Sequence, residues 1–471
     1  MKIRLLLLVL VISAQTVLSQ PLQQKMIAAY NAFEKDAQLK YGLSSLTALN
    51  SETGEVIFSR NGGIGLAPAS TLKTVTSATA FNILGKDFKW ETTLGYNGTI
   101  SNNGILKGDL ILKGSGDPTL GSDRYPQSKP EVLMEKWITA VKQSGIKRIE
   151  GKIIVDDSLF GTQTLPLGWI WQDIGNYYGS GSTSASWREN EFGLVFKAGA
   201  EPGDAAQFIR AEPKLADIKI INEVSTGEPG TGDNVYAYSS PYSDIIYVRG
   251  TYGIDLNKTI KVSIPDPALQ LAQELKDNLF RSSVPSSGFA TTQRILNSEG
   301  KPFAASSKII STYQSPSLSQ IVYWLNQKSL NLYAENLVKT IAVKQGKQAS
   351  FEDGTALIKD FWYKKAGIDP NSLGILDGSG LSPENRVTST AMAKILLSAK
   401  KENWFDSYYE SFPLYNNMKM KSGSIRNVLC YTGYQKSSSG TPIVFTFIVN
   451  NYNGSTSAIK QKMFKVLDTL K

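Results

Sequence analysis

The middle of the chain differs in texture from both of its ends, and this contrast restricts the fold more than any other feature. From Lys89 onward, short β-like runs alternate with Gly, Asn and Asp turns, and residues 161–242 are rich in Gly, Ser, Tyr and Trp. Small residues gather again at Ser282–Gly288, and helical patterns then return. The sequence therefore predicts a β-rich insertion over residues 89–284. It divides a domain formed by residues 20–88 and 285–471.

The two outer segments predict helices together with a sheet. Strands are expected at residues 43–49 and 56–59, and antiparallel strands near the end at 417–422, 427–435 and 443–450. Helices are expected at residues 22–39, 70–84, 318–327, 332–345, 351–365, 391–400 and 457–471. Within the middle section, residues 131–144 give the one clear helical pattern.

The first nineteen residues have the features of a secretory signal peptide. Lys2 and Arg4 precede an apolar run of about ten residues, and Ser19 offers a small residue for cleavage. The alternative is an uncleaved anchor, but the apolar run is short for a membrane span. We expect an exported protein with residues 1–19 removed and no stable membrane span.

Two absences limit the chemistry. The chain has no His, which excludes a Ser-His-Asp triad, a His base and His metal ligands. Its one Cys, Cys430, lies in an apolar run and is expected to be a buried, inert thiol. We therefore expect no metal site, and any nucleophilic catalysis needs another base, for which Lys is the obvious candidate. The net charge of +9 is not gathered in a Lys/Arg run, so nucleic-acid binding is not indicated.

Ser70 and Lys73 form a Ser-x-x-Lys pattern at the start of a predicted helix that follows Pro68 and stops at Gly85. Residues three apart share one face of a helix, so the hydroxyl and the amine can meet. The free N–H groups of the helix start could stabilise a developing negative charge. Taken alone, the pattern is better explained by a helix start with a solvated Lys.

Two later patterns are weak evidence separately, but their order along the chain after Ser70 and Lys73 is informative. Ser329 and Asn331 lie between two predicted helices, where capping is the alternative. Lys421, Ser422, Gly423 and Ser424 end a predicted strand; they could bind a carboxylate, with Gly423 letting a substrate backbone approach the strand edge. An ordinary edge strand is the alternative there. The order Ser-x-x-Lys, Ser-x-Asn, Lys-Ser-Gly matches the signature of β-lactamases and penicillin-binding proteins.

With more than 250 residues between Ser70 and Ser329, the chain resembles the D-alanyl-D-alanine carboxypeptidase/endopeptidases of the penicillin-binding protein 4 type. The resemblance implies an α/β (α+β) serine β-lactamase/transpeptidase-like domain, an antiparallel sheet flanked by helices, with a large β-rich two-part insertion. Further stretches that look like the family are Gly114–Leu120, Val155–Phe160, Gly168–Trp171, Gly175–Gly179 and Asp377–Ser382.

The resemblance also implies roles. Ser70 would attack the penultimate D-Ala of peptidoglycan stem peptides, Lys73 would take its proton, Ser329 would relay a proton to the leaving amine, and Asn331 would orient Lys73. The N–H groups of Ser70 and Ser424 would form the oxyanion hole. The terminal carboxylate would be held by Lys421, Ser422 and Ser424. No cofactor is implied, and β-lactams would acylate Ser70.

The sequence departs from the family at two positions. Ser422 stands where Thr is usual, and Pro383 stands where many relatives carry an Arg that recognises the peptide stem. Asp156 matches an acidic residue that lines the stem subsite in relatives. These differences leave the details of stem recognition open.

We expect a periplasmic serine D-Ala-D-Ala carboxypeptidase. A β-lactamase-like hydrolase and a non-catalytic cell-wall-binding protein are the alternatives. The sequence leaves open a D,D-endopeptidase activity and the oligomeric state.

Overall fold

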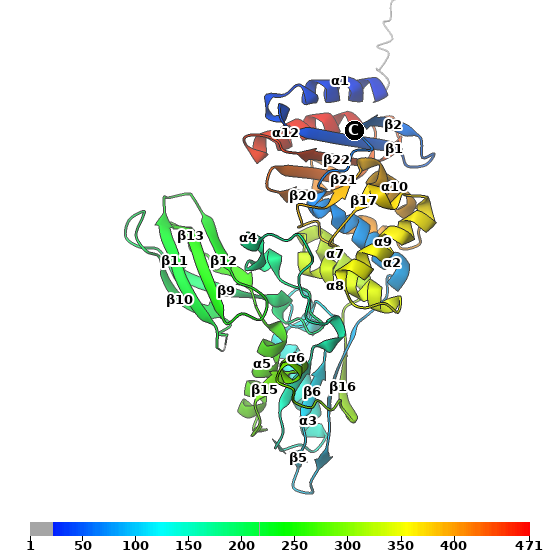
Figure 1. Cartoon of the computed structure of the whole chain (residues 1–471). Coiled ribbons are helices and arrows are strands. Elements are labelled where there is room, and N and C mark those ends of the chain that lie inside the picture. The colour runs from blue at the N-terminus through cyan, green and yellow to red at the C-terminus, as the bar shows by residue number, and fades with distance from the viewer. Residues whose placement is uncertain (1–21, 216) are drawn as a thin grey trace, which may run out of the picture.

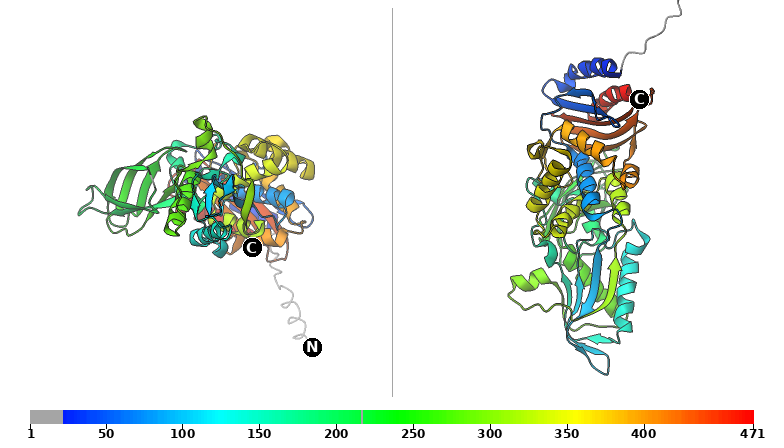
Figure 2. Two further views of the ribbon diagram at one scale, coloured as in Figure 1. Left: turned by 90° about the horizontal axis from the view of Figure 1, so that it is seen from below. Right: turned by 90° about the vertical axis from the view of Figure 1, so that its right-hand side faces the viewer.

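The computed structural model describes residues 22–215 and 217–471, so the predicted signal peptide lies outside the described residues. Figure 1 shows three parts: a unit that contains both ends of the described chain, a second part below it around β6, and a lobe that projects to one side. In Figure 2 the molecule is elongated, with α1 and the C-terminus at one end. Within the described part of the chain, no helix has the length and apolar character needed to cross a bilayer.

A six-stranded antiparallel sheet joins the two ends of the chain. β1, close to the N-terminus, pairs along its whole length with the last strand, β22. In sheet order the strands are β19 (Leu414–Tyr415), β20 (Met418–Ile425), β21 (Val428–Lys436), β22 (Pro442–Asn450), β1 (Leu43–Asn50) and β2 (Val56–Arg60). The strands expected in the outer segments are present, with β20 running on to Ile425.

Helices cover both faces of this sheet, which explains why its central strands are apolar almost throughout. Along β22, Val444 and Ile448 join one core cluster, whereas Phe445 and Phe447 join another on the opposite face. On the first face, α10 (Ser389–Ala399) lies directly against β1, β21 and β22. The same core cluster includes residues of α2 (Lys73–Leu84), α7 (Leu318–Lys328), α8 (Asn331–Lys344), α9 (Phe351–Ala366) and α11 (Phe405–Glu410). The second is covered by α1 (Leu22–Glu34) and α12 (Thr456–Leu467). Cys430 is buried in this sheet, as predicted.

Helix α2 lies at the centre of the first unit, and Lys73 to Phe81 are all buried. The hydroxyls of Ser77 and Thr79 donate to the carbonyl oxygens of Lys73 and Val75 one turn earlier, whereas Thr76 donates to the distant Gly378 carbonyl oxygen. These bonds satisfy polar groups that burial would otherwise penalise. A helix with small or apolar residues on every side can therefore occupy the core and hold its N-terminal turn in a fixed place.

The second part is built on a five-stranded sheet that mixes parallel and antiparallel pairs. In order, its strands are β15 (Ala290–Thr292), β8 (Ile153–Asp156), β6 (Leu110–Lys113), β3 (Glu91–Tyr96) and β16 (Lys308–Gln314). α3 (Pro130–Gln143) and α5 (Pro267–Arg281) pack on it through one apolar core. Smaller elements attached to it are α6 (Gln293–Ser298), β4 (Thr99–Ile100), β5 (Ile105–Lys107) and β7 (Arg148–Ile149).

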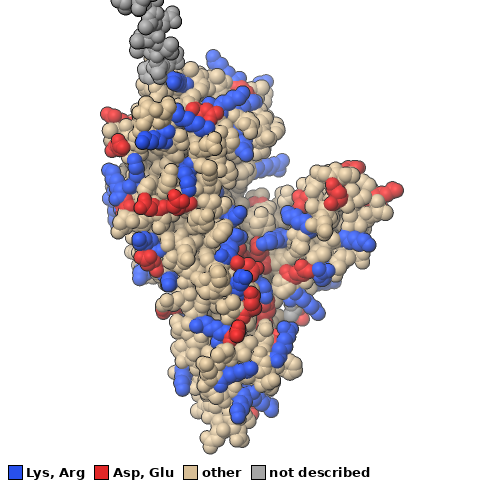
Figure 3. Space-filling view, turned by 180° about the vertical axis from the view of Figure 1, so that it is seen from behind, with Lys and Arg blue, Asp and Glu red and all other residues tan. Residues whose placement is uncertain are grey.

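The projecting lobe consists of two three-stranded sheets that share one apolar core. One sheet contains β10 (Gln207–Glu212), β9 (Glu191–Lys197) and β14 (Ile260–Ser263), and the other β11 (Lys219–Gly227), β13 (Ile245–Gly253) and β12 (Asp233–Tyr238). α4 (Trp171–Ile174) precedes the lobe, and the short pair β17 (Leu373–Gly374) and β18 (Arg386–Val387) belongs to the first unit. Figure 3 shows acidic side chains gathered where the lobe meets the body, and Lys and Arg side chains spread over the whole face.

The sheet pairing moves the end of the insertion beyond the expected residue 284. β15 pairs with β8, and β16 pairs with β3, so residues up to Gln314 complete the five-stranded sheet. The small-residue cluster at Ser282–Gly288 is a turn between α5 and β15, inside the insertion rather than at its edge. We therefore propose that the insertion covers about residues 89–315 and that the first unit resumes at α7.

Candidate active site

Ser70 and Lys73 meet at the start of α2, in a turn that opens as a 3-10 helix over Ala69–Leu72. The expected helix is present, but its α-helical part begins at Lys73. The Lys73 side chain is fully buried. Its Nζ donates to Ser70 Oγ at 2.9 Å, to Asn331 Oδ1 at 2.6 Å and to the Ser379 carbonyl oxygen at 2.8 Å. A nucleophile and a possible base are therefore in direct contact.

Burial controls the protonation of both active-site lysines. It lowers the pKa of Lys73 to about 7, although the nearby carboxylates of Glu335 and Asp377 oppose this effect. Burial also holds the pKa of Lys421 well below its usual range, and the positive charge of Lys73 adds to the shift. Burial thus favours the neutral form of both amines.

The Ser-x-Asn pattern forms the junction between α7 and α8. Ser329 closes α7 in the left-handed region, with φ of 57°, and Asn331 opens α8. This sharp turn aims both side chains at one cavity. Ser329 Oγ accepts from Lys421 Nζ at 3.0 Å, while Asn331 Nδ2 donates to the Tyr178 carbonyl oxygen at 2.7 Å. Asn331 therefore links Lys73 to the insertion.

The Lys421–Ser424 segment of β20 is only partly arranged as expected. Ser424 lines the cavity with Ser70, Ser329 and Asn331. Lys421 stands behind Ser329, and Ser422 contributes its backbone carbonyl oxygen, which accepts from Lys421 Nζ at 2.6 Å. The hydroxyl of Ser422 is not part of the cavity wall.

Gly423 serves a different purpose from the one expected. A Cβ atom at this position would lie 2.7 Å from the Pro68 carbonyl oxygen, 2.7 Å from the Thr71 nitrogen and 2.8 Å from the Ser70 nitrogen. The space left by the missing side chain is occupied by the turn that carries the nucleophile, not by a substrate backbone. Gly423 thus lets β20 approach that turn closely.

We predict that Gly423→Ala slows acylation of Ser70 by a penicillin about 10²-fold, because it pushes the Ser70 turn away from its partners. Rapid-mixing measurement of adduct formation tests this, with thermal unfolding as the check on folding. The matched control is Gly63→Ala, since a Cβ atom at Gly63 meets nothing within 4 Å. An unchanged acylation rate in Gly423→Ala would contradict the close-packing account.

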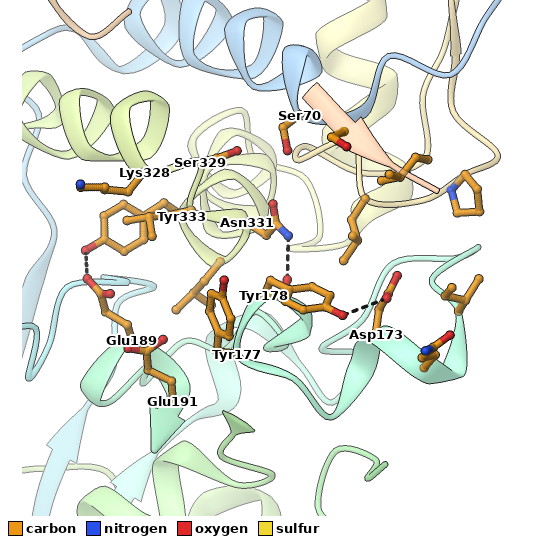
Figure 4. Close-up of a pocket in the computed structure, with 18 of the residues that line it drawn as sticks. Ser70, Asp173, Tyr177, Tyr178, Glu189, Glu191, Lys328, Ser329, Asn331 and Tyr333 are labelled. Atoms are coloured by element: carbon orange, nitrogen blue, oxygen red, sulfur yellow. Dashed lines mark hydrogen bonds between the residues drawn. The ribbon is translucent and has the colours of Figure 1, made fainter. Parts of the chain in front are cut away.

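The cavity has a volume of about 720 Å³ and is shared between the first unit and the insertion. Figure 4 shows Ser70, Ser329 and Asn331 on one side and side chains of the insertion opposite them. The insertion contributes Ile170, Gln172, Asp173, Tyr177, Tyr178, Glu189, Glu191 and Tyr236. None of these wall residues was among the predicted site residues, although the family-like stretches Gly168–Trp171 and Gly175–Gly179 contain Ile170 and two of the tyrosines.

Two acidic residues behave differently from the sequence-based expectation. Asp156 is not brought to the cavity: it is buried on β8, and its Oδ1 accepts from the backbone and hydroxyl of Ser158. Glu335, which the sequence analysis missed, is fully buried beside Lys73. Its position one helical turn after Asn331, on the same face of α8, was the available signal.

Across the described residues, no group of three or more Cys, Asp or Glu side chains is placed to hold a metal ion.

The chain is similar to known proteins over most of its length. A family model described as the D-Ala-D-Ala carboxypeptidase 3 (S13) family matches residues 26–470. A D-alanyl-D-alanine carboxypeptidase of Actinomadura sp. (strain R39) is 25% identical over 456 residues, which cover 90% of this chain and 80% of the relative. The D-alanyl-D-alanine carboxypeptidase DacB of Haemophilus influenzae is 25% identical over 439 residues, covering 88% and 86%.

The solved structures show the same fold. The crystal structure of penicillin binding protein 4 (dacB) from Haemophilus influenzae superposes with a TM-score of 0.77 at 24% identity, covering 91% of this chain and 96% of that one. A structure of the same protein complexed with a β-lactam gives a TM-score of 0.72 at 22% identity, covering 91% and 95%. The expected mixed α and β transpeptidase-like fold is thereby confirmed.

Proposed function

The chain belongs to the D-Ala-D-Ala carboxypeptidase 3 (S13) family, and from this premise we propose that it is a serine carboxypeptidase acting on peptidoglycan peptides through an acyl-enzyme on Ser70. One observation carries the choice of nucleophile. Ser70 Oγ lies 2.9 Å from the amine of a fully buried Lys73, in a chain without His. Within residues 22–215 and 217–471, Lys73 is the one side chain with which this hydroxyl makes a hydrogen bond.

In the proposed acylation, neutral Lys73 takes the Ser70 proton as Oγ attacks the carbonyl carbon of the penultimate D-Ala. The N–H groups of Ser70 and Ser424 face the developing oxyanion, and each such donor can contribute roughly 3 kcal/mol to transition-state stabilisation. Asn331 holds Lys73 through its Oδ1 atom. The tetrahedral intermediate then collapses as the bond to the terminal D-Ala breaks.

The leaving amine needs a proton, and Ser329 is placed to relay it. Its hydroxyl touches Lys421 Nζ, which is buried and gives up its proton readily. The carboxylate of the substrate would favour the charged form of Lys421, because an adjacent negative charge stabilises an ammonium group. Substrate binding would therefore load Lys421 with the proton that leaves on the terminal D-Ala. Water then attacks the acyl carbon as its bond to Ser70 Oγ breaks; Lys73 returns its proton to Oγ, and the proton of the water passes through Ser329 to Lys421.

β-Lactams would acylate Ser70 by the same attack, since the ring amide presents an equivalent carbonyl. We also propose that residues 1–19 are removed on export and that the protein acts in the periplasm, which contains its substrate. D,D-endopeptidase activity on cross-linked peptides would use the same acylation chemistry, with a second peptide as the leaving group.

The decisive test is incubation with isolated peptidoglycan fragments, with the products identified by mass. We expect fragments that end in D-Ala-D-Ala to lose one alanine, and cross-linked fragments to report any endopeptidase activity. A β-lactam adduct that persists on Ser70 supports the peptidase, whereas rapid release of hydrolysed β-lactam indicates a β-lactamase-like enzyme. Unchanged fragments in the presence of a labelled Ser70 would indicate a cell-wall-binding protein.

A further inference from the structure

Glu335 is a buried carboxylate beside Lys73 that has no role in the proposed chemistry. It is fully buried on α8. Its Oε2 accepts from the Gly378 N–H and its Oε1 from the Ser379 N–H, both at 2.9 Å. One carboxylate thus holds two successive backbone amides of the loop Asp377–Ser382, which we term the 377–382 loop. The Ser379 carbonyl oxygen, on the other side of the same residue, accepts from Lys73 Nζ at 2.8 Å.

The contacts of Lys73 explain why this carbonyl matters. A neutral amine has two N–H groups and one lone pair. Ser379 O and Asn331 Oδ1 carry no proton and can only accept, so together they take both N–H groups. The third neighbour of Nζ is Ser70 Oγ, at 2.9 Å. The lone pair must therefore face the hydroxyl whose proton it removes.

The rest of the 377–382 loop is fixed against its surroundings. The Asp377 carboxylate accepts from the N–H groups of Gly380 and Ser382. Gly380 has φ of +81°, and a Cβ atom there would lie 1.8 Å from the carbonyl oxygen of Ala69, next to the nucleophile. At the Gly378–Ser379 end, Glu335 holds the two amides, and the Thr76 hydroxyl donates to the Gly378 carbonyl oxygen at 2.7 Å.

We propose that Glu335 is a positioning residue for acylation: by holding the Gly378 and Ser379 amides, it aims the Ser379 carbonyl oxygen at Lys73 and so turns the amine lone pair toward Ser70. This inference rests on the proposed role of Ser70 as nucleophile. Glu335 touches neither Ser70 nor the cavity, so its action passes entirely through the loop and through charge.

The charge of Glu335 gives the proposal a distinctive readout. The groups that face it are Lys73 on α2, Asp377 on the loop and Lys339 on the next turn of α8, while Lys421 on β20 faces Lys73 from the far side. The Glu335 carboxylate raises the pKa of Lys73 against the effect of burial. Burial and the Asp377 charge raise the pKa of Glu335 itself to about 8, whereas its two backbone N–H donors and the Lys73 charge favour the carboxylate form. In the pH range where Glu335 is charged, replacing it by Gln should lower the pKa of Lys73 and move the acid limb of the pH–rate profile for acylation to lower pH.

The test compares Glu335→Gln with wild type in single-turnover acylation by a fluorescent penicillin between pH 5 and 9. An amide has one acceptor oxygen and would turn an NH₂ group toward one of the two N–H groups, so the loop must shift. We expect the maximal rate to fall about 10²-fold. We expect the midpoint of the rise in acylation rate with pH to move to lower pH by about one unit. A merely structural loss would lower the rate at every pH without moving the midpoint.

Glu335→Asp separates the two effects, because it keeps the charge but is one methylene too short to hold both amides. It should retain the wild-type midpoint with a rate reduced about tenfold. The matched control is Glu384→Gln, which removes an exposed carboxylate two residues beyond the 377–382 loop and should match wild type.

The outcomes are distinguishable from failure of the proposed function. If wild type is not labelled, or Ser70→Ala still is, the nucleophile assignment fails first. If wild type is labelled at Ser70 but Glu335→Gln has a wild-type rate or an unmoved midpoint, the positioning role is overturned alone. Should Glu335→Gln not fold, Glu335→Asp decides: a wild-type rate in that variant overturns the proposal.

Discussion

Ser70→Ala is expected to lose all covalent labelling by a penicillin and all peptide hydrolysis, while the protein folds as before. In the part of the chain that the structure describes, the Ser70 hydroxyl has one side-chain partner, Lys73, and that amine keeps two other acceptors when the hydroxyl is removed. The lost hydrogen bond should change the free energy of unfolding by about 1 kcal/mol. Gel fluorescence after incubation with a labelled penicillin measures the adduct, and thermal unfolding measures the stability.

Ser59→Ala is the matched control, since it removes a Ser hydroxyl from an exposed residue of β2, in the six-stranded sheet. It should be labelled like wild type. An adduct that survives in Ser70→Ala would place the nucleophile elsewhere and remove the basis of the mechanism proposed above. Loss of folding in Ser70→Ala would show instead that the turn at the start of α2 depends on the Ser70–Lys73 contact.

What could be predicted from the sequence was local. The Ser70–Lys73 contact depends on spacing within one helical turn, and the strands of the six-stranded sheet depend on short apolar runs with clear turns between them. Cys430 was predicted to be buried because it lies in such a run, and it is. Each of these predictions needs no knowledge of where distant segments lie.

What could not be predicted depends on contacts between distant segments. The end of the insertion was placed at residue 284 because a cluster of small residues resembles a boundary, but β16 returns to pair with β3 and completes the sheet of the insertion. Strand pairing across more than 200 residues leaves no local mark. Gly423 was assigned to substrate approach for the same reason, although its neighbour is the distant Ser70 turn.

The site residues likewise divide into those marked by local sequence patterns and those placed by contacts between distant segments. The Ser-x-x-Lys, Ser-x-Asn and Lys-Ser-Gly patterns identify the residues that meet around Ser70. The side chains that support them, such as Glu335, and those that face them from the insertion, such as Asp173 and Tyr178, are ordinary residues in ordinary sequence contexts. Only the packing of α8 against the 377–382 loop and of the insertion against α8 gives them a place in the site.

Lys73→Arg is expected to acylate at least about 10³-fold more slowly than wild type, within the range that general-base catalysis contributes. Burial lowers the pKa of Lys73 to about 7, so the wild-type amine loses its proton in the working range. Below that pH the amine is an ammonium group without a lone pair and cannot accept the Ser70 proton. The wild-type rate should therefore rise with pH through a midpoint near 7 and level off by about pH 9.

A guanidinium group stays protonated over this whole range, so Lys73→Arg should show no such rise. Because Arg is larger and the site is fully buried, Lys73→Met provides a neutral side chain of similar length, and it should be equally slow. Lys344→Arg, at the exposed end of α8, is the control for replacing a Lys by an Arg elsewhere in the protein. Acylation of Lys73→Arg at the wild-type rate would remove Lys73 as the base. The proton of Ser70 would then have to pass to a water or a carboxylate, and Glu335, which reaches Ser70 only through Lys73 and the 377–382 loop, would lose its proposed part as well.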